Sequence, residues 1–177
     1  DSGERTTRTL GDLGQRLSLI DKAQQEITAL SGQVVELQQI LDNKQARGAF
    51  GEAQLADIVR DGLPESAYAF QHTLSNGRRA DCLIRLPNPP GPVVVDSKFP
   101  LEAYQRWRGA ESDQAARTAL TDLRTDTQKH ATDIAERYII PGETADAALM
   151  FLPSESVFSE LHSRLPDLVE KCRAMRV

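Results

Sequence analysis

The sequence has few aromatic residues, only two cysteines and no long apolar run. Aromatics make up 5% of its 177 residues, yet 40% are apolar and 27% charged, a composition that excludes a wholly disordered or collagen-like chain. No stretch approaches the roughly 18 apolar residues of a membrane span, so we expect no membrane segment here. Cys82 and Cys172 are too few for a disulfide scaffold or a CxxC metal site, and they fit a reducing compartment, the cytoplasm.

Excess positive charge is also missing. The formal net charge is −5, so non-specific adhesion to nucleic acid is not the default expectation. The excess acids lie in the last third, whereas the middle third is neutral and carries a cluster of bases: Arg78, Arg79, Arg85, Lys98, Arg106 and Arg108. This cluster could contact phosphate locally, and the alternative is an ordinary solvated surface.

Residues 1–46 carry an apolar repeat of seven. The repeat consists of Leu13, Ile20, Ile27, Val34 and Leu41, and Ala23, Leu30 and Leu37 each follow three positions after one of them. Such a/d spacing is typical of a coiled coil. We therefore predict a helical arm that makes the chain a homo-oligomer, with a long helix packed elsewhere on its own chain as the alternative.

Residues 47–177 are predicted to form a mixed α/β (α+β) domain that is truncated at its C-terminus. The segment 43–51 contains two glycines and breaks the heptad pattern, and a helical pattern resumes over residues 51–63 and ends at Pro64. Three strand-like segments follow, separated by the turn sequences SNG and PNPPG. They predict an antiparallel three-stranded meander over residues 67–74, 78–86 and 92–99.

The sequence after the meander is mostly helical in pattern. A helix is expected over residues 100–138, with a break at 108–113, and two further helices over 154–174. The apolar run at 147–152 predicts a buried strand between them. Met175–Val177 resembles the beginning of another strand.

The PNPPG turn brings charged residues opposite one another. If the hairpin is centred between Asn88 and Pro89, Asp81 lies opposite Asp96, and Lys98 returns to the same face two residues later. Two close carboxylates among apolar neighbours need a shared proton or a cation, and their oxygens suit Mg²⁺ or Mn²⁺. The alternative is a salt-bridged trio without chemistry, and a register slip of one residue would change the face.

Three separated segments carry a resemblance to a known family. GAFGEAQL, GRRADCLIRLPNPPGPVVVDSKFPLEAY and LMFLPSESVFSELH, in that order, resemble the RmuC family of DNA recombination proteins over about residues 48–177. The resemblance implies a core similar to the PD-(D/E)xK restriction-endonuclease-like nucleases. Glu52 then matches the acid of the leading helix, Asp81 the acid of one strand, and Asp96 with Lys98 the acid-x-Lys of the next. All four would be catalytic, with Asp81 and Asp96 as metal ligands.

The sequence departs from the family pattern in two ways. Ala80 stands where a proline, which is not a ligand, usually precedes the first aspartate. Members of the family are also longer, because they usually begin with a membrane-anchor helix and continue beyond the strand expected at the end of this chain. We therefore expect an internal fragment of a protein whose full-length relatives are anchored to the inner membrane and face the cytoplasm.

These observations predict a Mg²⁺- or Mn²⁺-dependent deoxyribonuclease, active in the full-length protein, that acts in DNA recombination and repair and limits rearrangement. Lys98 would position the attacking water or stabilise transition-state charge. Arg78, Arg79 and Gln71 are candidate DNA contacts; otherwise they are solvated residues of a turn and a strand edge.

The sequence is also compatible with two other functions. The first is a catalytically silent nuclease-like fold that grips DNA or a partner and is tethered to a dimerising coiled coil. The second is a purely structural coiled-coil scaffold. The three histidines, His72, His130 and His162, lack ligand spacing and are predicted to lie on the surface or on helix faces.

Overall fold

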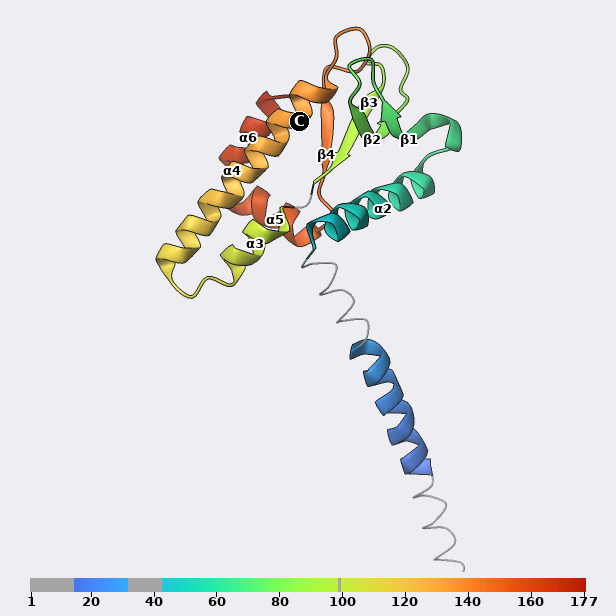
Figure 1. Cartoon of the computed structure of the whole chain (residues 1–177), viewed down its shortest axis with the longest axis vertical. Coiled ribbons are helices and arrows are strands. Elements are labelled where there is room, and N and C mark those ends of the chain that lie inside the picture. Colours follow the sequence, from blue (N-terminus) through green and yellow to red (C-terminus); the bar gives the residue numbers. More distant parts are fainter. Residues whose placement is uncertain (1–14, 32–42, 99) are drawn as a thin grey trace, which may run out of the picture. The chain divides into compact units, whose positions relative to one another are not determined.

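The computed structural model describes residues 15–31, 43–98 and 100–177 (Figure 1). The chain divides into two units, Asp1–Lys44 and Gln45–Val177. Within the described ranges, no helix combines the length and the apolar character that crossing a membrane requires.

The first unit contains a helix over residues 15–31, and every side chain in that range is exposed. Ile20, Ile27 and Leu30 of the predicted heptad stripe are 56%, 62% and 62% exposed. Exposed apolar residues at this spacing are what a coiled-coil partner would cover. The heptad residues Leu13, Val34, Leu37 and Leu41 lie outside the described residues, so self-association stays a prediction.

The second unit is built from helices around one sheet. Its elements are α2 (Lys44–Gly62), a 3₁₀ turn (Glu65–Ala67), β1 (Tyr68–Thr73), β2 (Arg79–Ile84), β3 (Val93–Ser97), α3 (Leu101–Arg108), α4 (Asp113–Tyr138), β4 (Ala148–Phe151), α5 (Glu155–Arg164) and α6 (Pro166–Ala174). The break between α3 and α4 falls in the segment where the sequence predicts it. Ser112 starts α4 by accepting a hydrogen bond from the Ala115 N–H (3.2 Å).

The sheet has the strand order β1-β2-β3-β4. The first three strands form an antiparallel meander, and β4 joins β3 in parallel. The predicted mixed α/β fold with an antiparallel meander and flanking helices is therefore confirmed.

The two faces of the sheet pack on different helices (Figure 1). On one face, Leu55 and Val59 of α2 form a cluster with Cys82 and Val95. On the other face, Ile134 and Tyr138 of α4 form a cluster with Leu83, Val94 and Ala148. Neighbouring residues of β2 and β3 thus alternate between α2 and α4, as side chains of a pleated strand do.

The helix resumes earlier than the sequence predicts, because α2 begins at Lys44, directly after the non-helical Asn43, and runs through both glycines. Gly51 serves close packing. A Cβ on this residue would lie 2.5 Å from Ser97 Oγ and 3.2 Å from Pro153 Cγ, whereas a Cβ on Gly48 would meet nothing within 4 Å. The missing side chain at Gly51 lets α2 approach the end of β3, and this brings the next residue, Glu52, to the sheet.

The strand predicted at Met175–Val177 is also wrong. These residues turn after α6, and Arg176 adopts a positive φ of 66°. The segment still contacts the sheet, because the Arg176 carbonyl accepts a hydrogen bond from the Ala148 N–H at the start of β4 (2.9 Å).

Candidate active site

The β2–β3 hairpin has the register that the turn sequence predicts. Cys82 pairs with Val95, Leu83 with Val94, and Ile84 with Val93. The pairing ends at Cys82 and Val95, so Asp81 and Asp96 come next at the open end of the hairpin. The apolar pairs lie inside the sheet, and the two acids follow where regular pairing stops.

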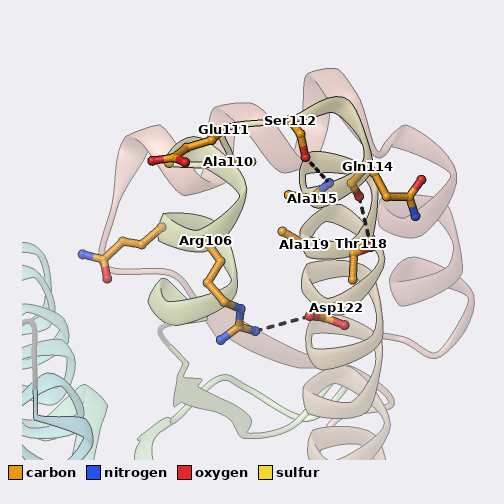
Figure 2. A pocket seen from close by; sticks show the side chains of 11 residues that line it. Arg106, Ala110, Glu111, Ser112, Gln114, Ala115, Thr118, Ala119 and Asp122 are labelled. Atoms are coloured by element: carbon orange, nitrogen blue, oxygen red, sulfur yellow. Dashed lines mark hydrogen bonds and ion pairs between the residues drawn. The ribbon is translucent and has the colours of Figure 1, made fainter.

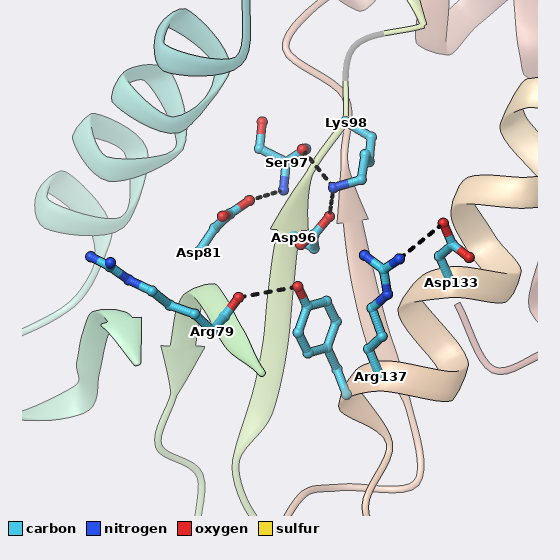
Figure 3. Close-up of polar contacts among 8 residues, drawn as sticks. Arg79, Asp81, Asp96, Ser97, Lys98, Asp133 and Arg137 are labelled. Atoms are coloured by element: carbon cyan, nitrogen blue, oxygen red, sulfur yellow. Dashed lines mark hydrogen bonds and ion pairs between the residues drawn. The ribbon is translucent and has the colours of Figure 1, made fainter. Parts of the chain in front are cut away.

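Asp81 does not simply face Asp96 across the hairpin. Its Oδ2 accepts a hydrogen bond from the backbone N–H of Ser97 (2.7 Å), so this carboxylate satisfies a main-chain donor of β3 (Figure 3). Burial raises the pKa of Asp81 to about 6; the Ser97 N–H opposes this shift, and the charges of Asp96 and Glu52 add to it. Lys98 acts in the opposite direction.

Asp96 and Lys98 form an ion pair at the end of β3. The side chain of Asp96 is 3% exposed and that of Lys98 is 27% exposed. The Lys98 ammonium donates to Asp96 Oδ2 and lies 3.4 Å from the Ser97 carbonyl oxygen (Figure 3). The Lys98 backbone N–H donates to the Phe151 carbonyl of β4 (2.9 Å), which anchors the residue to the sheet.

Glu52 reaches this group from α2. It is exposed, its Oε2 accepts a hydrogen bond from Gln71 Nε2 (2.9 Å), and its charge contributes to the raised pKa of Asp81. The structure thus brings Glu52, Asp81, Asp96 and Lys98 into one electrostatic neighbourhood, although they come from a helix and two strands.

Of the candidate DNA contacts Gln71, Arg78 and Arg79, only Gln71 has a hydrogen bond to one of the four site residues. Gln71 joins the acids through Glu52. Arg79 is exposed and its guanidinium points away from the acids (Figure 3), while its carbonyl oxygen accepts a hydrogen bond from the Tyr138 hydroxyl. Arg78 is exposed in the turn after β1, where its N–H donates to Asn76 Oδ1 (3.0 Å).

The other bases of the sequence cluster contact their own chain. These contacts are ion pairs of Arg106 with Asp122 (3.6 Å) and of Arg108 with Glu160 (3.7 Å), and hydrogen bonds from Arg85 to the carbonyls of Ser66 (3.1 Å) and Tyr68 (2.7 Å). The bases therefore do not form one phosphate-binding surface at the acids.

Sequence analysis missed the contribution of α4. The Tyr138 hydroxyl donates to the Arg79 carbonyl (3.2 Å), and its pKa is raised by burial and by the Asp96 carboxylate. His130 is half-buried, and burial together with the Lys98 charge lowers its pKa. His130, Ile134 and Tyr138 recur every four residues, so the helical period predicts that they share one face of α4. The period does not predict that this face covers Asp96.

The acids suit a hard divalent cation. Repulsion among the carboxylates of Glu52, Asp81 and Asp96 is what a cation would relieve. In the part of the chain that the structure describes, no three His, Cys, Asp or Glu side chains are arranged as a metal-ligand set. A Mg²⁺ site commonly uses one or two carboxylates together with water and substrate phosphate, so Asp81 and Asp96 are the residues that could hold one.

A groove of about 780 Å³ lies away from these acids, between α3 and α4 (Figure 2). Its charged residues include Arg106 and Asp122, which pair with each other. Ser112 and Thr118 in the lining make hydrogen bonds within α4 and its cap. This groove has no convergent set of reactive groups, so the acids at the end of the hairpin are the stronger candidate site.

Comparisons with known proteins point to one family. The RmuC family matches residues 2–177. The chain is 29% identical to the DNA recombination protein RmuC homolog of Xylella fastidiosa (strain Temecula1 / ATCC 700964) over 171 residues, 90% of this chain and 38% of the relative. It is 33% identical to the DNA recombination protein RmuC of Escherichia coli (strain K12) over 137 residues, 72% of this chain and 28% of the relative.

A third relative extends the same pattern. The DNA recombination protein RmuC homolog of Vibrio cholerae (serotype O1, strain El Tor Inaba N16961) is 34% identical over 151 residues, which are 79% of this chain and 29% of that protein. The chain thus spans between about a quarter and two fifths of the length of these curated relatives. No solved structure matches it significantly. On the match over residues 2–177, the chain belongs to the RmuC family.

Proposed function

We propose that this chain contains the acidic centre of a metal-dependent DNA nuclease that acts in DNA recombination and repair. The observation that carries the proposal is the group of three acids and one lysine at the end of the β2–β3 hairpin, where burial and the neighbouring acids raise the pKa of Asp81 to about 6. Perturbed groups of this kind concentrate at functional sites. The relatives' names supply DNA recombination as the process.

The chemistry would be hydrolysis of a phosphodiester. A water oxygen loses a proton as it bonds to phosphorus, the bond from phosphorus to the leaving oxygen breaks, and the leaving oxygen takes up a proton. Asp81 and Asp96 would hold Mg²⁺ or Mn²⁺, which when bound supplies Lewis acidity and lowers the pKa of water. Lys98 would orient the attacking water or stabilise the negative charge on the phosphoryl oxygens.

Glu52 would act from α2 as a further ligand or through a water. Arg78 and Arg79, both exposed, would contact the DNA backbone outside the acids. We also propose that the heptad stripe on the N-terminal arm pairs chains into a homo-oligomer. The two free cysteines, both buried, fit action in the reducing cytoplasm.

A second candidate function is a silent nuclease-like fold that binds DNA without cleaving it. The observation that favours it is the ion pair between Lys98 and Asp96, since a lysine engaged by its own acid is less available to a phosphate. This function requires the same fold but no turnover.

Cleavage of a supercoiled plasmid by the full-length protein with Mn²⁺, with Mg²⁺ and with EDTA tests the proposal. We expect cleavage only with metal, and a loss of about 100-fold or more in Lys98→Ala. Lys171→Ala on α6 is the matched control, because Lys171 is exposed and carries the same charge. Binding of DNA without cleavage by the wild type would support the silent fold, and equal cleavage in both variants would refute a role for Lys98.

A further inference from the structure

The backbone of β1 has an irregularity at Gln71. This residue has a φ of +51°, in the left-handed region, and Arg176 is the other non-glycine residue with positive φ in the described ranges. Both neighbours of Gln71 pair normally with β2: Phe70 lies opposite Cys82 and His72 opposite Ala80. The irregularity is thus confined to one residue within a paired strand, and it is not a consequence of a strand end.

Strand alternation explains what the irregularity changes. Phe70 packs against the cluster that α2 makes with the sheet, and Arg60 of α2 lies 5.0 Å from the centre of its ring. In a regular strand, residue 71 would point to the opposite face. Gln71 nevertheless donates from Nε2 to Oε2 of Glu52, which is on α2. The positive φ accounts for this departure from alternation.

We propose that Gln71 is a positioning residue whose left-handed backbone directs its side-chain amide to α2, where it holds the Glu52 carboxylate beside Asp81 for metal binding. This inference rests on the proposed metal-dependent function. By register, Gln71 stands across from Asp81, because its neighbours pair with the residues on either side of that acid. One residue of β1 therefore donates a hydrogen bond to the helix acid and stands across from the strand acid.

The chemistry of an amide suits this task. An exposed glutamate samples several rotamers, and a hydrogen bond to one oxygen restricts them while the second oxygen keeps its lone pairs. A lysine or arginine at position 71 would neutralise the negative charge of Glu52 that attracts a cation. A glutamine is neutral and leaves the Glu52 carboxylate fully negative. Partners that orient a ligand in this way commonly contribute to metal affinity.

The strain itself supports a functional origin. A left-handed conformation is unfavourable for a residue with a Cβ, and it persists only when the surrounding structure enforces it. Glycine would adopt the same conformation without this penalty. A strained glutamine at this position is explained if its side chain is required.

Calorimetric titration of Mn²⁺ into the wild type, Gln71→Ala, Glu52→Ala and the double variant tests the inference. We expect Gln71→Ala to weaken binding by about tenfold in the wild type and to have no further effect in the Glu52→Ala background. Gln54→Ala is the control, because Gln54 is half-buried on α2 two residues from Glu52 and should leave affinity unchanged. Unchanged affinity in Gln71→Ala, or an equal loss with and without Glu52, would overturn the inference.

Thermal melts of Gln71→Gly and Gln71→Ala test the backbone separately. Because glycine accepts a positive φ, we expect Gln71→Gly to melt a few degrees above Gln71→Ala, the reverse of the order in a regular strand. The opposite order would contradict the left-handed conformation. Absence of Mn²⁺ binding in the wild type would refute the proposed function and this inference together, whereas wild-type binding that Gln71→Ala retains would refute the inference alone.

Discussion

The two halves of the β2–β3 hairpin follow one register but differ in chemistry. In the inner half, Leu83 and Val94 pair within the apolar core beneath α4. At the open end, Asp96 is 2% exposed and Asp81 is half-buried with a raised pKa. The apolar pairs of the inner half stabilise the fold. The buried and half-buried carboxylates at the open end lower its stability. Such a cost is expected at a functional site and not in a structural core.

The largest effect should come from the inner half. Val94 is fully buried, so Val94→Ala removes two methyl groups and leaves a cavity, and we expect it to lower the free energy of unfolding by about 2–3 kcal/mol. Val93→Ala, at a half-buried residue of the same strand, should cost clearly less. Urea denaturation measures both, and similar losses would contradict the difference in burial between the two valines.

A smaller effect should appear where α2 meets the open end. Gly51→Ala places a Cβ against Ser97 Oγ and Pro153, whereas Gly48→Ala meets open space on the same helix. We expect Gly48→Ala to raise the free energy of unfolding by about 0.5–1 kcal/mol. The free energy of unfolding of Gly51→Ala should lie about 1–2 kcal/mol below that of Gly48→Ala. Equal urea midpoints for the two variants would contradict the close approach of α2 to β3.

The smallest effect should come from the charge of Asp81. Because its pKa is raised from 3.8 to about 6, the folded state binds more protons than the unfolded state between these values, and stability falls as pH rises through this range. Asp81→Asn removes this loss and keeps an oxygen for the Ser97 N–H. Allowing for partial exposure, we expect it to stabilise by about 1 kcal/mol at pH 7, and the difference should vanish below about pH 4.

Asp57→Asn supplies the control for that pH series. Asp57 lies on α2 with its side chain 77% exposed, so its substitution should change stability little between pH 4 and 7. If Asp81→Asn is instead less stable than the wild type at pH 7, Asp81 is a structural acceptor for Ser97 and not a destabilising charge.

The hairpin was predictable because local rules determine it. The PNPPG turn set the register, and the alternating apolar residues of β2 and β3 set the faces. The end of the pairing at Cys82 was not predictable, since it depends on Asp81 replacing a main-chain acceptor of Ser97. The close packing of α2 at Gly51 was missed because its contact with Pro153 joins distant segments.

The part of the site that lies on the hairpin was predictable, because local rules determine the hairpin. Asp81, Asp96 and Lys98 share one hairpin, so spacing alone brings them near one another. Glu52 could be assigned only through the family resemblance, because it comes from a separate helix. The role of α4 at Asp96 could not be derived, since periodicity gives the face of a helix but not what that face covers.

Calorimetric titration of Mn²⁺ into the wild type, Asp81→Asn, Asp96→Asn and Asp57→Asn tests the central claim, that the open end of the hairpin holds a divalent cation. All three variants change the charge equally, but only two remove a proposed ligand. We predict that Asp81→Asn and Asp96→Asn each weaken binding by about tenfold or more, that Asp57→Asn binds like the wild type, and that a short DNA duplex tightens wild-type binding. Equal heats in all four proteins would contradict the claim.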